Sequence, residues 1–314
     1  MNGTQRDHGG GLDVAVLRFG GVRSDWCDLS TGINPQPYPV PPMTPDAWSA
    51  LPDADAMSRL IRAARAYWSV PDQAAVLAAP GASVLIAQIP LLADPGTVSI
   101  RAPTYNEHAA AFSAAGWEVT AGSAGDAQVL VHPNNPDGRL SSPRDLRAPI
   151  CIVDESFCDI LPGASMMPAA RRPGVLILKS FGKFWGLAGL RLGFAIGDPG
   201  LVAMLSERIG PWAVSGPALE TGAAALEDPA WSAETRLRLA KDSTRLDGLM
   251  RRAGAHLQGG TPLFRLYDVP DASEWQEQLA SHRIWSRIFP YSDRWLRLGL
   301  PHPDRWAHLE AALR

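Results

Sequence analysis

The spacing of apolar positions predicts a chain in which strands and helices alternate. Helical spacing is found at 57–68, 84–92 and 107–115, and short apolar runs typical of strands fall at 97–101, 128–132, 150–153, 175–178 and 192–196. Strands that alternate with helices favour a mostly parallel sheet covered on both faces, because parallel strands need long crossover connections. We therefore expect an α/β fold for this part of the chain.

The pattern changes on either side of this alternating region. Residues 1–46 are rich in glycine and proline, which is typical of an extended arm. After residue 210, helical patterns at 217–226 and 231–253 precede strand patterns at 263–267, 284–288 and 295–298, which favours a smaller α+β domain. The sequence thus predicts an arm over 1–46, a large domain over 47–210, and linking helices with a small C-terminal domain over 211–314.

The composition of the 314 residues is that of an ordinary globular enzyme, with 46% hydrophobic and 19% charged residues. A net charge of -3 gives no bias toward nucleic acid or an anionic membrane, and no apolar run reaches the roughly 20 residues of a membrane span. Residues 1–11 lack the apolar core of a signal peptide, and the three cysteines are not spaced as metal ligands. We expect a cytoplasmic protein with reduced thiols and no metal site.

Polar residues at the ends of the predicted strands carry the candidate chemistry. In open α/β sheets, ligands bind beyond the carboxyl ends of the strands. The groups found there are the amide of Asn135, the carboxylate of Asp154, Ser180 with the amine of Lys183, and the guanidinium of Arg191. A cofactor with a ring hydroxyl, a pyridine nitrogen, an aldehyde and a phosphate would use all of them.

Each of these groups also has a simpler explanation. Lys183 could be a solvated loop residue and Asp154 a helix cap. Asn135 could belong only to a turn before Pro136, and Arg191 to a surface ion pair. The order and spacing of the four groups together favour the cofactor site.

Three motifs resemble those of the fold-type-I pyridoxal-phosphate enzymes, the aspartate aminotransferase superfamily. They are Pro133-Asn-Asn135-Pro-Asp-Gly138, Val153-Asp154-Glu155 and Ser180-Phe-Gly-Lys183-Phe-Trp-Gly-Leu-Ala-Gly-Leu-Arg191-Leu-Gly193, and they occur in the family's order. The resemblance covers about 29–301. It implies a large domain with a mostly parallel, seven-stranded sheet, a smaller α+β C-terminal domain, and pyridoxal 5'-phosphate as cofactor.

The resemblance also implies a role for each matched residue. Lys183 would hold the cofactor as a Schiff base and move the proton, Asp154 would pair with the pyridinium nitrogen, and Asn135 would bind the ring hydroxyl oxygen. Tyr105 would stack on the ring. The cofactor phosphate would be held by Gly81, Ala82 and Ser83 before a predicted helix, together with Ser180 and Arg191.

Within this superfamily the chain resembles the L-threonine-O-3-phosphate decarboxylases of cobalamin biosynthesis. The shared features are His8-Gly9-Gly10, Asp28-Leu-Ser-Thr-Gly-Ile-Asn34-Pro35, Gly210-Pro-Trp212-Ala-Val-Ser215-Gly-Pro217, and Phe157 where related aminotransferases have a tyrosine. This resemblance implies decarboxylation of L-threonine O-3-phosphate to (R)-1-amino-2-propanol O-2-phosphate. The alternatives are an aminotransferase of the histidinol-phosphate type and a non-catalytic binding module on the same fold.

The same resemblance implies the residues that bind the substrate. Arg297 would bind the carboxylate, Arg287 and His8 the phosphate, and Asn34 and Asn135 would complete the site. Arg287 could instead be an exposed strand residue. A homodimer with the active site at the subunit interface is implied as well.

Overall fold

The computed structural model describes residues 8–122 and 125–314, and the chain divides into two compact units. The small unit contains 8–36, 136–138 and 234–314. The large unit contains 37–135 and 139–233.

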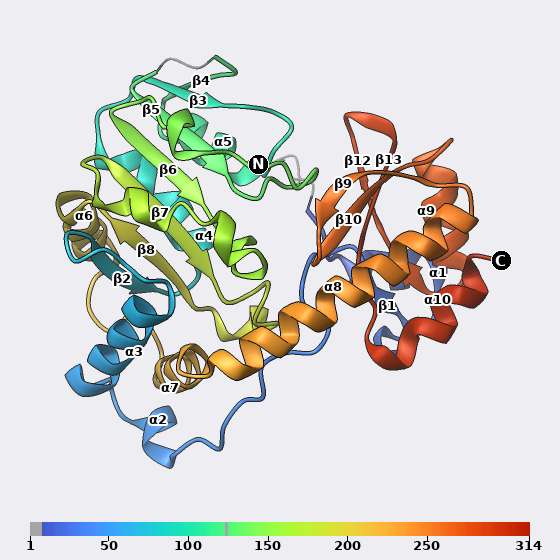
Figure 1. The fold of residues 1–314 in the computed structure, drawn as a ribbon, viewed down its shortest axis with the longest axis horizontal. Coiled ribbons are helices and arrows are strands. Elements are labelled where there is room, and N and C mark those ends of the chain that lie inside the picture. The colour runs from blue at the N-terminus through green and yellow to red at the C-terminus, as the bar shows by residue number, and fades with distance from the viewer. Residues whose placement is uncertain (1–7, 123–124) are drawn as a thin grey trace. The chain divides into compact units, whose positions relative to one another are not determined.

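The large unit is built on a seven-stranded sheet (Figure 1). In spatial order its strands are β2 (Ala75–Ala79), β8 (Gly193–Gly197), β7 (Val175–Ser180), β6 (Ile150–Asp154), β5 (Ala127–Val131), β3 (Thr97–Ile100) and β4 (Glu118–Thr120). The pairs from β7 to β4 are parallel, whereas β8 is antiparallel to both β7 and β2. The prediction of a mostly parallel sheet is confirmed.

Helices surround this sheet, and several begin with a side-chain cap. They are α2 (Pro45–Ser49), α3 (Ala54–Tyr67), α4 (Ala82–Gln88), α5 (Asn106–Ala114), α6 (Pro199–Ile209) and α7 (Gly216–Leu226). Asp53 accepts a hydrogen bond from the Ala56 N–H at the start of α3, and Ser215 accepts one from the Ala218 N–H at the start of α7. Such caps satisfy N–H groups that have no partner within the helix.

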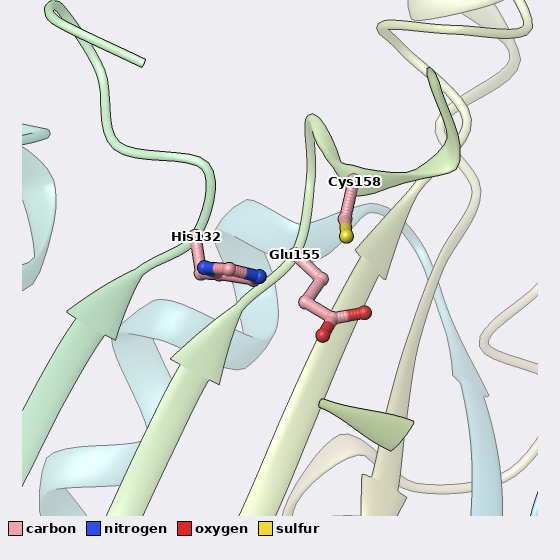
Figure 2. Close-up of side chains that lie close together, drawn as sticks. All are labelled: His132, Glu155 and Cys158. Carbon is pink, nitrogen blue, oxygen red and sulfur yellow. The ribbon is translucent and has the colours of Figure 1, made fainter. Parts of the chain in front are cut away.

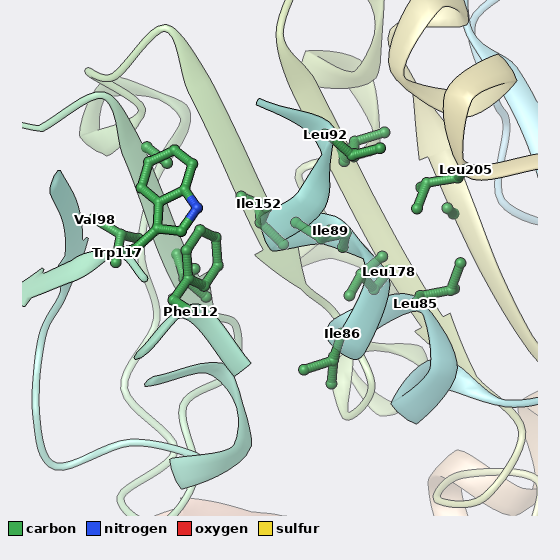
Figure 3. Packing of buried hydrophobic residues seen from close by; sticks show 14 of the residues in the cluster. Leu85, Ile86, Ile89, Leu92, Val98, Phe112, Trp117, Ile152, Leu178 and Leu205 are labelled. Carbon is green, nitrogen blue, oxygen red and sulfur yellow. The ribbon is translucent and has the colours of Figure 1, made fainter. Parts of the chain in front are cut away.

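A hydrophobic core cluster of the large unit lies on one face of the sheet. Ile152 of β6 and Leu178 of β7 pack there against Leu85 of α4 and Phe112 of α5 (Figure 3). Because successive side chains of a strand point to opposite faces, Asp154 lies on the same face as Ile152. Asp154 is paired in register with the last residue of β5. The carboxyl ends of these strands therefore meet at one edge of the sheet.

The small unit contains two sheets. The larger has the order β12 (Arg287–Phe289), β13 (Ser292–Gly299), β10 (Phe264–Asp268) and β9 (His256–Thr261), with antiparallel pairs throughout. The smaller pairs β1 (Cys27–Asp28) with β11 (Ile284–Trp285) in parallel. The unit also contains α1 (Leu12–Phe19), most of α8 (Pro229–Arg252), α9 (Ala272–Ser281) and α10 (Trp306–Ala312).

One predicted element of this unit is wrong. The sequence predicts a single strand over 284–288, but the chain forms β11 and β12, which belong to different sheets. Ser286 separates them, and its carbonyl oxygen accepts a hydrogen bond from the Gln276 side chain rather than from a strand. None of the helices formed by 8–122 and 125–314 combines the length and apolar character that crossing a membrane requires.

Candidate active site

The large unit contains a cavity at the carboxyl ends of β5, β6 and β7. Its wall includes eight residues that the sequence singles out for a cofactor, namely Ala82, Ser83, Tyr105, Asn135, Asp154, Ser180, Lys183 and Arg191. They come from segments up to 109 residues apart in the sequence, and the sheet brings them to one place. Amine, carboxylate, amide, hydroxyl and guanidinium groups thus face one small volume.

Asp154 is the buried acid of this cavity. One carboxylate oxygen accepts a hydrogen bond from the Ser156 N–H at 3.0 Å, and the other lies 2.9 Å from Nε2 of His108. Burial raises the pKa of Asp154, but the hydrogen bonds from His108 and Ser156 outweigh it and hold the pKa below its ordinary value. The group is therefore an anion at neutral pH, which suits contact with a protonated ring nitrogen.

The sequence interpretation missed His108. It lies on α5, one helical turn after Tyr105, and is almost fully buried. His108 follows Tyr105 by three residues, and in a helix this spacing brings two side chains to the same side. The spacing could therefore have identified His108 from the sequence. A buried histidine beside Asp154 keeps that carboxylate in a fixed orientation.

Lys183 lies on the loop that follows β7. Its Nζ is 5.3 Å from the centre of the Phe157 ring, and Phe157 is buried in the cavity wall. The face of the Phe157 ring thus lies beside the Lys183 amine.

The opposite end of the cavity is suited to a phosphate. Gly81 has φ +90°, and a Cβ atom there would lie 2.6 Å from Nη2 of Arg191. A Cβ atom on Gly193 would lie 2.5 Å from the backbone nitrogen of Ala82. The two glycines therefore allow the guanidinium and the first turn of α4 to lie close together, next to Ser180. The donors present at both ends of the cavity fit pyridoxal 5'-phosphate.

Three potential metal ligands lie nearby, at the ends of β5 and β6. His132, Glu155 and Cys158 have ligand atoms within 4.8 Å of one another (Figure 2). Nδ1 of His132 accepts a hydrogen bond from the Ser141 N–H, and Glu155 lies 2.7 Å from the Lys179 ammonium. His132 and Glu155 therefore already have partners, and the buried ammonium of Lys179 lies next to Glu155. A metal ion would be repelled by this positive charge, so the cluster does not suit one.

The small unit contains a second cavity, and the two arginines of the substrate prediction lie beside each other near it. His8, Ser30 and Arg287 line the cavity. Arg287 of β12 is the register partner of Arg297 on β13, so both side chains project from the same face of the sheet. Arg297 is buried and donates a hydrogen bond to the Ser30 carbonyl oxygen at 2.7 Å.

The N-terminal arm packs closely against this arginine. A Cβ atom on Gly9 would lie 2.5 Å from the Ser30 carbonyl oxygen and 3.4 Å from Nη2 of Arg297. Asn34, another residue of the substrate prediction, is buried, and its Oδ1 accepts hydrogen bonds from Arg238 and the Gln36 N–H. His8 of the arm thus lines the same cavity as Arg287 of β12. Asn34 does not line this cavity, and its hydrogen bond with Arg238 connects the arm to α8 within the small unit.

Comparison with known proteins defines the class. Residues 47–309 match the family described as Aminotransferase class I and II, so the chain belongs to this family. A crystal structure of histidinol-phosphate aminotransferase from Sinorhizobium meliloti, determined in complex with pyridoxal-5'-phosphate, has the same fold. Its TM-score is 0.79 at 18% identity, and the match covers 97% of this chain and 93% of that one. The predicted fold class and superfamily are confirmed.

Two relatives match this chain over nearly its whole length. A threonine-phosphate decarboxylase of Pseudomonas aeruginosa is 38% identical, and the match covers 98% of this chain and 97% of the relative. A threonine-phosphate decarboxylase of Sinorhizobium sp is 40% identical, with coverage of 95% and 93%. The resemblance to this decarboxylase family, inferred from the motifs, is confirmed.

Proposed function

We propose that this protein is a pyridoxal-phosphate-dependent decarboxylase that converts L-threonine O-3-phosphate to (R)-1-amino-2-propanol O-2-phosphate in cobalamin biosynthesis. The observation that carries the proposal is the identity of about 40% with two threonine-phosphate decarboxylases over nearly the whole of each chain. The cavity supports it, because eight of the residues predicted to hold the cofactor line it together.

The residues of the large unit bind and orient the cofactor. These residues line one cavity. The amine of Lys183 would hold the aldehyde carbon of the cofactor, Asp154 would pair with its ring nitrogen, and Asn135 would contact its hydroxyl oxygen. Arg191 and Ser180 would hold its phosphate. The bound cofactor would supply an electron sink for the pair left on the substrate Cα as carbon dioxide departs. Lys183 then gives a proton to Cα, and the low pKa of Asp154 keeps a negative charge beside the ring nitrogen throughout.

The residues of the small unit orient the substrate. Arg297 binds the carboxylate, and Arg287 with His8 binds the phosphate. Since the arginines are register partners on adjacent strands, rigid backbone fixes the distance between the two anchors. Two anchors would set the rotation of the amino acid about its Cα, and this rotation would decide which bond to Cα breaks. Phosphate binding thereby favours loss of the carboxylate.

The experiment that tests the proposal is product analysis. The purified protein is incubated with L-threonine O-3-phosphate and 2-oxoglutarate together. We expect carbon dioxide and aminopropanol phosphate in equal amounts, with no glutamate. Glutamate formed in step with substrate loss, without carbon dioxide, would assign the chain to the aminotransferases. Binding of the cofactor without turnover of either kind would favour a non-catalytic module.

We also propose a homodimer located in the cytoplasm. The most exposed of the large apolar side chains described in the large unit are Trp48 at 73%, Leu51 at 67% and Trp212 at 61%. Exposed aromatic and aliphatic side chains of this kind favour a protein interface. Cys27, Cys151 and Cys158 are free and buried, which agrees with a reducing compartment. Sedimentation of the purified chain should give twice its mass of 33.7 kDa, and a monomer would contradict the dimer.

A further inference from the structure

A buried group of charges lies behind the cofactor cavity. Nζ of Lys179 is 2.7 Å from the carboxylate of Glu155 and 3.2 Å from that of Asp159, and all three residues are at most 4% exposed. Lys179 precedes Ser180 on β7, and Glu155 follows Asp154 at the end of β6. Because side chains alternate along a strand, Lys179 lies on the face of the sheet opposite to Ser180.

Two tryptophans complete the bonding of Asp159. The indole Nε1–H of Trp68 donates to Oδ1 at 2.9 Å, and that of Trp185 donates to Oδ2 at 3.0 Å. Glu155 in turn accepts hydrogen bonds from the Ser165 hydroxyl and the Met166 N–H. Each carboxylate oxygen of the network therefore has a donor.

Lys179 keeps its positive charge at neutral pH. Burial alone lowers the pKa of Lys179, but the carboxylates of Glu155 and Asp159 outweigh it and raise the pKa above its ordinary value. Burying charges in this way costs desolvation that apolar residues of similar size avoid, so stability alone does not account for the arrangement.

Trp185 connects this network to the loop of Lys183. It lies two residues after Lys183, is fully buried, and stacks on Phe181 with ring centres 5.2 Å apart. On its other side it stacks on Trp231 with ring centres 5.4 Å apart. Phe181 and Trp185 thus fix the loop on both sides of the lysine, and Asp159 fixes the indole edge.

We propose that Asp159 is a positioning residue that holds Trp185, and through it the loop that places the Lys183 amine against the cofactor. The proposal rests on the cofactor assignment of the proposed function, but it does not depend on which substrate bond is broken. Trp68 provides an internal control, because it donates an equivalent hydrogen bond to the same carboxylate but belongs to the end of α3 and not to the Lys183 loop.

The experiment compares Trp185→Phe with Trp68→Phe in the cofactor-loaded protein. Each change removes one indole N–H donor and retains an aromatic ring. The measurements are the pKa of the bound cofactor, read from its visible absorption against pH, then kcat, KM and thermal unfolding. We expect Trp185→Phe to shift the spectroscopic pKa by about 0.5 to 1 unit and to lower kcat about tenfold, with KM little changed. Trp68→Phe should leave the spectroscopic pKa and kcat unchanged.

A second variant tests the carboxylate directly. Asp159→Asn keeps one carbonyl acceptor and should shift the spectroscopic pKa in the same direction as Trp185→Phe. Equal shifts in both tryptophan variants, or a loss of thermal stability in both without any shift, would make the network purely structural and overturn the proposal. Absence of a visible band in the loaded wild-type protein would overturn the cofactor assignment itself, and this outcome is distinguishable from an unshifted band.

Discussion

The two cavities of this protein place charged groups by different means. In the cofactor cavity, Asp154 and Lys183 sit at the end of a strand or on the loop that follows it. In the small unit, Arg287 and Arg297 come together through the register of two antiparallel strands, and Gly9 packs against the second of them. The first arrangement gathers strand ends that are up to 109 residues apart in the sequence, and the sheet order brings them together. The second depends on the register of two consecutive strands, which places Arg287 opposite Arg297.

The support behind the charged groups also differs. Behind the cofactor cavity, Lys179 and its two carboxylates form a fully bonded ionic network. In the small unit, aromatic faces support the guanidiniums, since the Arg297 guanidinium lies 5.3 Å from the Phe264 ring centre and that of Arg287 lies 5.3 Å from Phe289. Substitutions in the cofactor cavity should therefore act on rate, and those in the small unit on substrate binding.

The largest effect is expected at Lys183. Lys183→Ala should lower decarboxylation by about a thousandfold or more, because one amine both holds the cofactor and moves the proton. The variant should still bind cofactor through Arg191, Ser180 and Asp154, which equilibrium dialysis can measure. Lys241→Ala, at an exposed helical lysine, is the matched control and should be fully active. Near wild-type activity of Lys183→Ala would contradict the assignment of Lys183 as the lysine that holds the cofactor and moves the proton.

A smaller loss is expected at Asp154. Asp154→Asn should lower kcat by about a hundredfold with a much smaller change in cofactor affinity, because the negative charge beside the ring nitrogen is lost. His108→Asn should lower kcat less, since the carboxylate remains. Steady-state kinetics and cofactor titration measure both effects. If Asp154→Asn kept most of its rate, another group would have to protonate the ring.

The sequence predicted the cofactor cavity better than the arginine cavity, and the reason is physical. Motifs that combine a strand end with its loop predict roles for Lys183 and Asp154, and both residues line one cavity. His108 escaped notice because its role depends on how α5 packs over β6. The separation of β11 from β12 at Ser286 was also missed. The apolar pattern over 284–288 is as compatible with one strand as with two short strands. The bonding of Lys179 likewise follows from packing, and no local pattern distinguishes it from an ordinary core position.

The arginine pair allows a more selective test. Arg287→Ala should raise KM for L-threonine O-3-phosphate about ten- to a hundredfold, because a charge-assisted contact with phosphate contributes about 1.5–3 kcal/mol. Its effect on unphosphorylated threonine should be smaller. Arg297→Ala should impair both substrates, because both carry the carboxylate. Equal losses for both substrates in Arg287→Ala would make Arg287 a structural residue.

The smallest effect concerns alkaline stability, where both units contain a group that keeps its proton in the folded state. Carboxylates raise the pKa of Lys179 in the large unit, and burial, reinforced by Asp247, raises the pKa of Tyr267 in the small unit. A group with a raised folded-state pKa contributes stability below its unfolded pKa, which is about 10.4 for lysine and about 10 for tyrosine, and this stability is lost as the pH rises further. Each group should therefore add a slope of about -1.4 kcal/mol per pH unit to the free energy of unfolding above pH ~10.5.

Urea unfolding of Tyr267→Phe and Lys179→Met is measured between pH 9 and 11.5. In both variants the free energy of unfolding should decline less steeply with pH than in the wild type, whatever their stability at neutral pH. A slope unchanged in Lys179→Met but reduced in Tyr267→Phe would mean that the ammonium behind the cofactor cavity exchanges its proton in the folded state as readily as in the unfolded chain.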